Sequence, residues 1–204
     1  LESSENYDAG VSLSDCIMAI QKFGICKESL WPYDIKKFTN RPSAEALQDA
    51  GANKDKFDIN RIKKVSQKLS VMKNILNRQF PFACGIKIYE SFESKEVERT
   101  GLVLMPGKNE AYKGSHAVVF VGYDDNVNGG SFEIMNSWGN DFGENGFCWI
   151  SYEDLKQFGA TVCSLIDFEI PPIKEKLKIE ANLEFILGVR EQNNKLIFNT
   201  PMNV

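Results

Sequence analysis

The residues of this sequence that are best suited to chemistry are one histidine and five cysteines. His116 is the single histidine among the 204 residues. A lone histidine excludes a multi-histidine metal centre, and no Cys-x-x-Cys or Cys-x-x-His spacing replaces it, so we expect no metal site. Any histidine chemistry in this chain therefore uses His116.

The five cysteines are odd in number, widely spaced and set mostly among apolar neighbours. This pattern favours free, buried thiols in a reducing compartment over a set of disulfides. We therefore expect each of them to serve in packing. The residues are Cys16, Cys26, Cys84, Cys148 and Cys163.

His116 begins a strand-like apolar run that ends at Tyr123, and Asn136 follows a second such run. A turn-rich connection at residues 124–130 would make the two runs neighbouring strands, which brings His116 near Asn136. An amide oxygen that accepts a hydrogen bond from one ring nitrogen fixes the tautomer and leaves the other nitrogen free to act as a base. The alternative is a histidine satisfied in the core or at a sheet edge, followed by a turn with a buried tryptophan.

Helices are expected in the first part of the chain. Residues 13–23 carry an apolar stripe at helical spacing, with Ser12 or Ser14 as the N-cap and Gly24 as the stop. A short helix over residues 43–49 and a clear one over residues 62–76 follow, the latter ending before Pro81.

Beyond Pro81 the period becomes strand-like. We expect strands at residues 82–89, 116–123, 131–136, 147–152 and 161–170, separated by Gly, Asn and Asp turns. Helices followed by antiparallel strands indicate an α+β protein of two lobes. We expect a helical lobe over residues 1–78, an antiparallel β lobe over 79–170, and a tail over 171–204 that could form a hairpin around residues 191–194.

Composition excludes several classes of partner. Acidic residues outnumber basic ones by 28 to 24, and no basic cluster is interleaved with aromatic residues, so we expect no nucleic-acid partner. No apolar run approaches the ~20 residues that span a bilayer, and residues 1–10 do not resemble a signal peptide, so we expect no membrane association.

Two segments, residues 114–123 and 132–147, together resemble the carboxy-terminal half of the papain-like cysteine peptidases (cathepsin-type, C1 family). In that family a strand that starts with His-Ala-Val and continues to Gly-Tyr precedes an Asn-Ser-Trp-Gly motif and a Gly-Glu-Asn-Gly loop. Here Phe142 and Phe147 stand where Trp and Tyr are usual. The resemblance spans residues 8–170, and residues 88–94 are similar to the disulfide-poor members found in microbes and large viruses.

The resemblance implies a papain-like two-lobe fold and a cysteine-type endopeptidase with a Cys-His-Asn mechanism and no cofactor. By this resemblance His116 is the partner of the thiolate and the acid that protonates the leaving amine. Asn136 orients His116, and Trp138 shields their hydrogen bond from water.

The resemblance also implies how a peptide substrate is held. The backbone of Ala9 and Gly10 would pair with the extended substrate as an added strand. Gly85, Gly114 and Ser115 would border a roomy apolar pocket for one substrate side chain.

The nucleophile of the family lies in a Gln-x-x-x-Cys-Gly-Ser-Cys-Trp segment upstream of the Asp-Ala-Gly region. None of the five cysteines here has such flanks, so we expect the nucleophile Cys and the oxyanion Gln upstream of Leu1. The helix that carries the nucleophile would normally cover residues 13–23 and the apolar face of 62–76, so both should be exposed in this chain.

Three explanations remain open at this stage: a fragment of a longer enzyme, a chain that needs a partner chain, or an inactive relative that binds peptides without cleaving them. The expected partners are a peptide or protein substrate and the upstream segment or chain with the nucleophile. The thiol pattern favours a reducing intracellular compartment or a virion.

Overall fold

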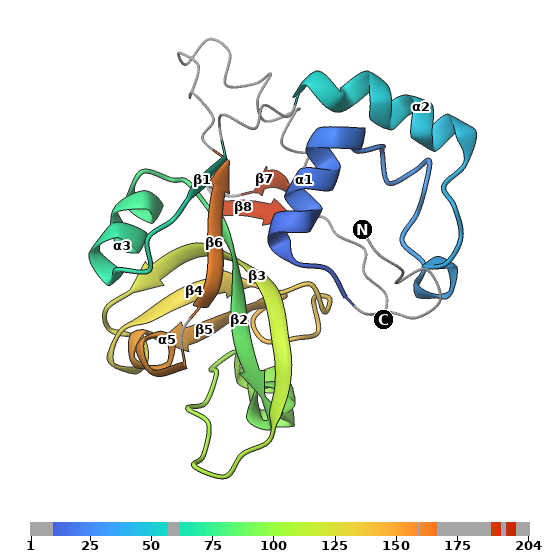
Figure 1. Cartoon of the computed structure of the whole chain (residues 1–204). Helices are drawn as coiled ribbons and strands as arrows, with labels where there is room; N and C mark the ends of the chain where they lie inside the picture. Colours follow the sequence, from blue (N-terminus) through green and yellow to red (C-terminus); the bar gives the residue numbers. More distant parts are fainter. Residues whose placement is uncertain (1–9, 57–61, 159, 167–188, 193–194, 199–204) are drawn as a thin grey trace. The chain divides into compact units, whose positions relative to one another are not determined.

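The computed structural model describes residues 10–56, 62–158, 160–166, 189–192 and 195–198 (Figure 1). The chain divides into two compact units, Leu1–Asn60 and Arg61–Val204. The division falls earlier than the lobe boundary expected at residue 78, since residues 62–64 pair within the sheet of the second unit. Among the described residues, no helix has the length and apolar character needed to cross a membrane.

The first unit is helical. Its elements are α1 (Leu13–Phe23), η1 (Ile35–Lys37), α2 (Ala44–Asn53) and η2 (Lys54–Lys56). Helix α1 has the bounds expected from the sequence: the Ser12 hydroxyl accepts the Asp15 N–H at 3.0 Å, and Gly24 ends the helix. Only glycine fits at position 24, because its φ is +79° and a Cβ atom would lie 1.9 Å from the Ala50 carbonyl oxygen.

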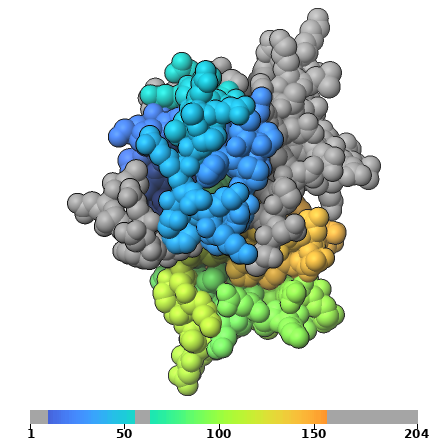
Figure 2. Space-filling model, turned by 90° about the vertical axis from the view of Figure 1, so that its right-hand side faces the viewer, coloured from blue at the N-terminus to red at the C-terminus, as the bar shows by residue number. Residues whose placement is uncertain are grey.

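The apolar stripe of α1 is only partly covered. No residue of α1 is buried, and Met18 and Phe23 are 54% and 52% exposed. Many blue and cyan atoms of this unit lie at the surface that faces the viewer in Figure 2. The expected exposure of the stripe is therefore confirmed in part: Cys16 and Phe23 are exposed, and the other stripe residues are half-buried. The expectation that Cys16 is buried is wrong, because a residue in the stripe is buried only if something covers the stripe.

The second unit is built on a six-stranded antiparallel sheet with the order β1-β6-β2-β3-β4-β5. The strands are β1 (Ile62–Lys64), β2 (Phe82–Tyr89), β3 (Tyr112–Asp124), β4 (Ser131–Met135), β5 (Phe147–Ser151) and β6 (Ala160–Ile166). The helices are α3 (Leu69–Asn77), η4 (Glu90–Glu93), α4 (Lys95–Thr100), η5 (Val127–Gly129) and α5 (Tyr152–Phe158). Helices and an antiparallel sheet together give the α+β class expected from the sequence.

The helix expected over residues 62–76 is wrong in its first part. Residues 62–64 form β1 and pair with β6, and α3 begins only at Leu69. The expected exposure of this apolar face is also wrong, because Met72 and Leu76 of α3 are buried. In the tail, β7 (Val189–Gln192) and β8 (Lys195–Phe198) pair as a hairpin, while residues 177–187 lie outside the described residues.

The core of the second unit lies on one face of β2 and β3. Alternate residues of β2 from Phe82 to Ile88 are buried, as are Val118 and Phe120 of β3. The rings of Phe82 and Phe120 stack with their centroids 5.2 Å apart. Ile86 pairs with His116 in the β2–β3 register, so the histidine lies on the same face as the core residues.

Candidate active site

His116 lies near the start of β3, one of the two long neighbouring strands in Figure 1. Its side chain is half-buried, with Ile86 opposite it on β2 and Val118 next along the same face of β3. Pairing of β3 with β2 (residues 82–89) thus fixes the backbone position of His116. The imidazole stands at the edge of the core, where it keeps partial access to solvent.

Asn136 follows directly after β4, whose last residue, Met135, pairs with Val119 of β3. The backbone N–H of Asn136 donates to the Gly146 carbonyl at 2.9 Å, which holds the end of β4 in place. Asn136 is 5% exposed, and its Oδ1 lies 2.7 Å from Nε2 of His116. The two neighbouring strands therefore bring together the two residues that the sequence pattern paired.

A backbone N–H, in addition to the His116 ring, orients the Asn136 amide. Its Oδ1 also accepts the backbone N–H of Ser137 at 2.8 Å. Rotating the amide would place its NH2 group against that N–H, so the oxygen faces the ring and Nε2 of His116 is the donor. Nδ1 is then the ring nitrogen that remains for other chemistry. The Nδ2 group of Asn136 is buried and has no hydrogen-bond partner in the part of the chain that is described.

Aromatic rings surround this pair. The Trp138 ring lies 4.9 Å from the His116 ring between centroids, and Phe142 packs edge-on against Trp138 at 5.0 Å. Phe92 contacts both Trp138 and His116, at 5.4 and 6.1 Å. Phe92 is 3% exposed and Phe142 is 6% exposed, so these rings lower the local polarity around the His116–Asn136 hydrogen bond.

Phe92 was not anticipated from the sequence, and Phe142 was noted only as a replacement for tryptophan. No local signal marks Phe92, because its contact with His116 depends on the path of η4 relative to β3. The contact becomes evident only once the sheet and η4 are assembled.

The glycine-rich loop after Trp138 turns tightly for a steric reason. Gly143 has a φ of +60°, and a Cβ atom there would lie 2.3 Å from the Phe147 carbonyl oxygen. Its N–H donates to the Glu98 carbonyl at 2.6 Å, which joins the loop to α4. The loop therefore returns the chain to β5 while Phe142 stays in the aromatic cluster.

The residues expected to border a substrate pocket have mixed placements. Gly114 and Ser115 precede His116 on β3, and Gly85 is buried on β2 opposite Ala117. A Cβ atom on Gly114 would meet nothing within 4 Å, so the space beside this residue is open. The Ser115 side chain is exposed, and its Oγ lies 3.2 Å from the Tyr112 hydroxyl.

The two residues expected to pair with substrate backbone belong to the first unit. Ala9 lies outside the described residues. Gly10 is exposed and has a φ of +68°.

The described cysteines differ in their environments. Cys148 on β5 is 0% exposed, and burial raises the pKa of its thiol to about 12, so it stays protonated at neutral pH. Cys84 is also fully buried but is disulfide-bonded, which corrects the expectation of a free thiol; the residue opposite it on β6 is Cys163. Cys26 is partly buried, and the pKa of its thiol is raised mainly by burial.

The described residues hold no group of three or more His, Cys, Asp or Glu side chains placed to bind a metal ion. The second unit holds one oriented imidazole in a partly apolar setting. An imidazole with one nitrogen fixed by an amide and the other free can exchange a proton with a nucleophile.

Comparison with protein families identifies the family of the chain. Residues 4–166 match the family described as papain family cysteine protease. The chain belongs to the papain family of cysteine proteases. An uncharacterized peptidase C1-like protein of Acanthamoeba polyphaga mimivirus is 35% identical to it over 157 residues. That match covers 75% of this chain and 50% of the viral protein, so the chain spans about half the length of this curated relative.

Solved structures of cysteine proteases share this papain-like fold. Xylellain, a cysteine protease from Xylella fastidiosa, superposes with a TM-score of 0.69 at 31% identity, covering 81% of this chain and 65% of xylellain. A digestive procathepsin L from the larval midgut of Tenebrio molitor matches with a TM-score of 0.57 at 20% identity, over 78% of this chain and 49% of its own, and bears on the fold alone. The expected fold class and family are thus confirmed.

Proposed function

We propose that this chain carries the histidine and asparagine of a cysteine-type endopeptidase. Its thiolate nucleophile and oxyanion glutamine belong to a segment upstream of Leu1. The observation that carries the proposal is the 2.7 Å hydrogen bond between His116 and the doubly anchored Asn136 amide. Membership of the papain family supports the reaction class.

In the proposed mechanism, Asn136 holds Nε2–H of His116, and Nδ1 exchanges a proton with the thiol. The resulting thiolate attacks the peptide carbonyl, and the imidazolium gives its Nδ1 proton to the departing amine as the C–N bond breaks. Water then attacks the thioester while Nδ1 takes up its proton, which releases the carboxylic acid and restores the thiol. Trp138 limits the access of water to the His116–Asn136 hydrogen bond throughout.

The cysteines of the second unit are poor candidates for the nucleophile. Cys148 is fully buried and its pKa is raised to about 12, and Cys84 is held in a disulfide. Cys16 and Cys26 belong to the first unit and lack the flanking residues of the family nucleophile.

We further propose that Gly85, Gly114 and Ser115 border the pocket for one substrate side chain, and that Ala9 and Gly10 pair with substrate backbone. The open space beside Gly114 favours a large apolar or aromatic substrate side chain.

The experiment that tests the proposal is covalent labelling of the natural protein with a peptide-based thiol electrophile, followed by intact mass and mapping of the labelled residue. We expect one label on a cysteine upstream of Leu1, with a labelling rate at least ~100-fold lower in His116→Ala. Cys16→Ser is the control that removes labelling of an exposed thiol. An intact mass equal to that of the 204 printed residues, with no selectively labelled thiol, would favour the alternative of an inactive peptide-binding relative.

A further inference from the structure

The short helix η4 beside the active site lacks a side-chain cap from its own N-cap residue, Tyr89. Backbone N–H groups in the first turn of a helix need an acceptor from elsewhere. Glu110, nineteen residues further along the chain, supplies one: its Oε1 accepts the N–H of Ser91. A distant glutamate therefore takes the role that a local cap plays in other helices.

Glu110 is itself held by several contacts. Its Oε2 accepts the Gly107 N–H at 2.8 Å, and its own N–H donates to the Gly107 carbonyl at 3.1 Å. Next to it, the Glu90 N–H donates to the Ala111 carbonyl at 3.1 Å. Burial raises the pKa of Glu110, but the hydrogen bonds from Ser91 and Gly107 outweigh it, so the pKa is lowered overall and the carboxylate stays ionised.

Phe92 follows Ser91 directly and connects the Glu110–Ser91 hydrogen bond to the site around His116. Phe92 contacts the rings of His116, Trp138 and Phe142, with centroids 6.1, 5.4 and 6.0 Å away. The Ser91 N–H is therefore bound to the Glu110 carboxylate, and the ring of the next residue, Phe92, contacts the rings of His116 and Trp138.

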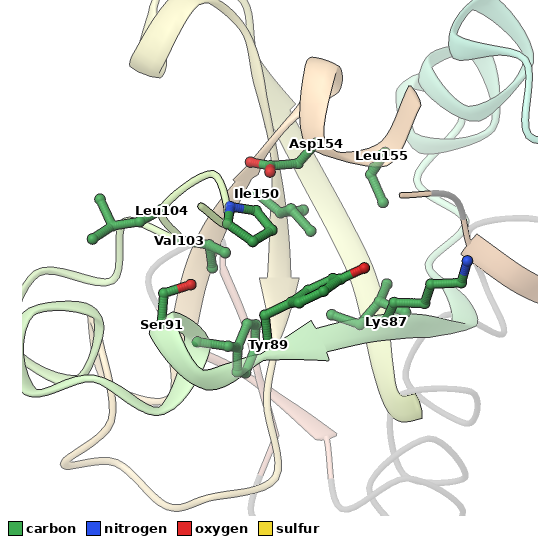
Figure 3. Close-up of a pocket in the computed structure, with 11 residues that line it drawn as sticks. Lys87, Tyr89, Ser91, Val103, Leu104, Ile150, Asp154 and Leu155 are labelled. Atoms are coloured by element: carbon green, nitrogen blue, oxygen red, sulfur yellow. The ribbon is translucent and has the colours of Figure 1, made fainter. Parts of the chain in front are cut away.

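Phe92 is not packed on every side. A small cavity of about 20 Å³, the space of roughly one water molecule, borders it and is also lined by Ile86, Val103 and Ile150. Figure 3 shows Ser91 and Tyr89 of the η4 turn across this cavity from Ile150 and Asp154. Because the cavity leaves free space beside Phe92, we expect the position of its ring to depend on the backbone of η4 as well as on side-chain packing.

We propose that Glu110 is a positioning residue for His116: it anchors η4 so that Phe92 stays against Trp138 and the imidazole, and water is kept from the His116–Asn136 hydrogen bond. The effect on turnover rests on the proposed peptidase function, whereas the effect on the imidazole does not.

The primary test is nitrogen-15 NMR of the His116 imidazole in the natural protein, with its signals assigned by their loss in His116→Gln. We expect Glu110→Ala to speed solvent exchange of the Nε2–H proton by about tenfold and to move its chemical shift. Glu110→Gln keeps one acceptor oxygen, so its effect should be intermediate, and it serves as the test if the alanine variant does not fold.

The matched control is Glu93→Ala, which removes an exposed carboxylate from η4 itself. Equal changes in Glu93→Ala and Glu110→Ala would overturn the proposal, because loss of charge near the site would then be the cause. Unchanged exchange and chemical shift in a folded Glu110 variant would also overturn it.

A double-mutant cycle tests the route through Phe92. In a Phe92→Leu background, Glu110→Ala should have less than half of its effect on Nε2–H exchange, and full additivity would contradict the proposed route. In the active peptidase, Glu110→Ala should lower kcat about three- to tenfold with KM nearly unchanged. A normal kcat together with altered exchange would refute the link to turnover, and failure of wild-type cleavage would count against the proposed function instead.

Discussion

The two units of this protein bury their apolar residues to very different degrees. In the first unit, α1 has no buried residue, and the buried positions among residues 10–56 are confined to α2: Ala46, Ala50 and Asn53. In the second unit, one continuous core extends from Val65 to Ile150 and includes six strand residues of β2 and β3 with exposures of 8% or less. Within the part of the chain that is described, only the second unit has a substantial core of its own.

This difference explains why the His116–Asn136 pair can be well ordered within the second unit. A catalytic pair needs neighbours whose own positions are fixed, and a packed sheet provides them. The partly exposed stripe of α1 instead has the pattern of a helix face suited to covering by further protein. The expected effects below are ordered from the largest to the smallest.

The largest effect on stability should come from Phe82→Ala in the second unit. Phe82 is 1% exposed and stacks on Phe120, so its removal leaves a cavity in the core. We expect the free energy of unfolding to fall by about 3–5 kcal/mol. Urea denaturation followed by tryptophan fluorescence measures it. A loss below about 1 kcal/mol would show that the core is less tightly packed than described.

Asn136→Ala should have the next largest effect, and on activity more than on stability. Loss of the Oδ1 acceptor frees the ring of His116 from its orientation, so we expect kcat/KM for peptide cleavage to fall by about 100-fold, equivalent to about 2.7 kcal/mol. Steady-state kinetics checks this. Ser137→Ala, which keeps the backbone N–H at Oδ1, is the control and should retain near-normal activity.

The same aromatic truncation in the first unit should cost much less. Phe23 ends α1 and is 52% exposed, so Phe23→Ala should lower the free energy of unfolding by less than about 1 kcal/mol. Denaturation under the conditions used for Phe82→Ala gives a direct comparison. Equal losses for the two variants would show that the stripe of α1 is covered in solution.

The smallest effect concerns the ion pair that joins α3 to the connection after β3. Lys73 of α3 donates to Asp125 at 2.7 Å, and Tyr152 donates to the same oxygen at 2.8 Å. The hydrogen bond from Lys73, followed by that from Tyr152, lowers the pKa of Asp125. A lowered folded-state pKa gives stability above the ordinary value of 3.8 that is lost as the pH falls through the folded-state value.

Asp125→Asn should therefore lower Tm at pH 7, and the difference from wild type should shrink as the pH falls below 3.8. Thermal unfolding at several pH values measures it, with the exposed Asp141→Asn as control. A difference in Tm that is the same at every pH would rule out the ionised form of Asp125 as its source.

The sequence predicted elements whose signals are local. The bounds of α1 and β2 agree with expectation, because a helical or strand-like period and its capping or proline residues lie within each segment. The order of His116 and Asn136 on neighbouring strands also followed from a short connection between two apolar runs.

Elements stabilised from a distance were missed or misassigned. Residues 62–64 have the spacing of a helix but form β1, because β6 lies about 100 residues later in the chain and pairs with them. Helices α4 and α5 have only six and seven residues, too few to give a clear period.

The sequence by itself determined the family and the α+β class, and it predicted that His116 and Asn136 lie together, because these depend on residue types in a fixed local order. Tertiary structure alone decided which ring nitrogen meets the amide, that Phe92 backs the imidazole, and that Glu110 caps η4. These features depend on distances between segments separated by many residues, and such distances exist only after the sheet has formed.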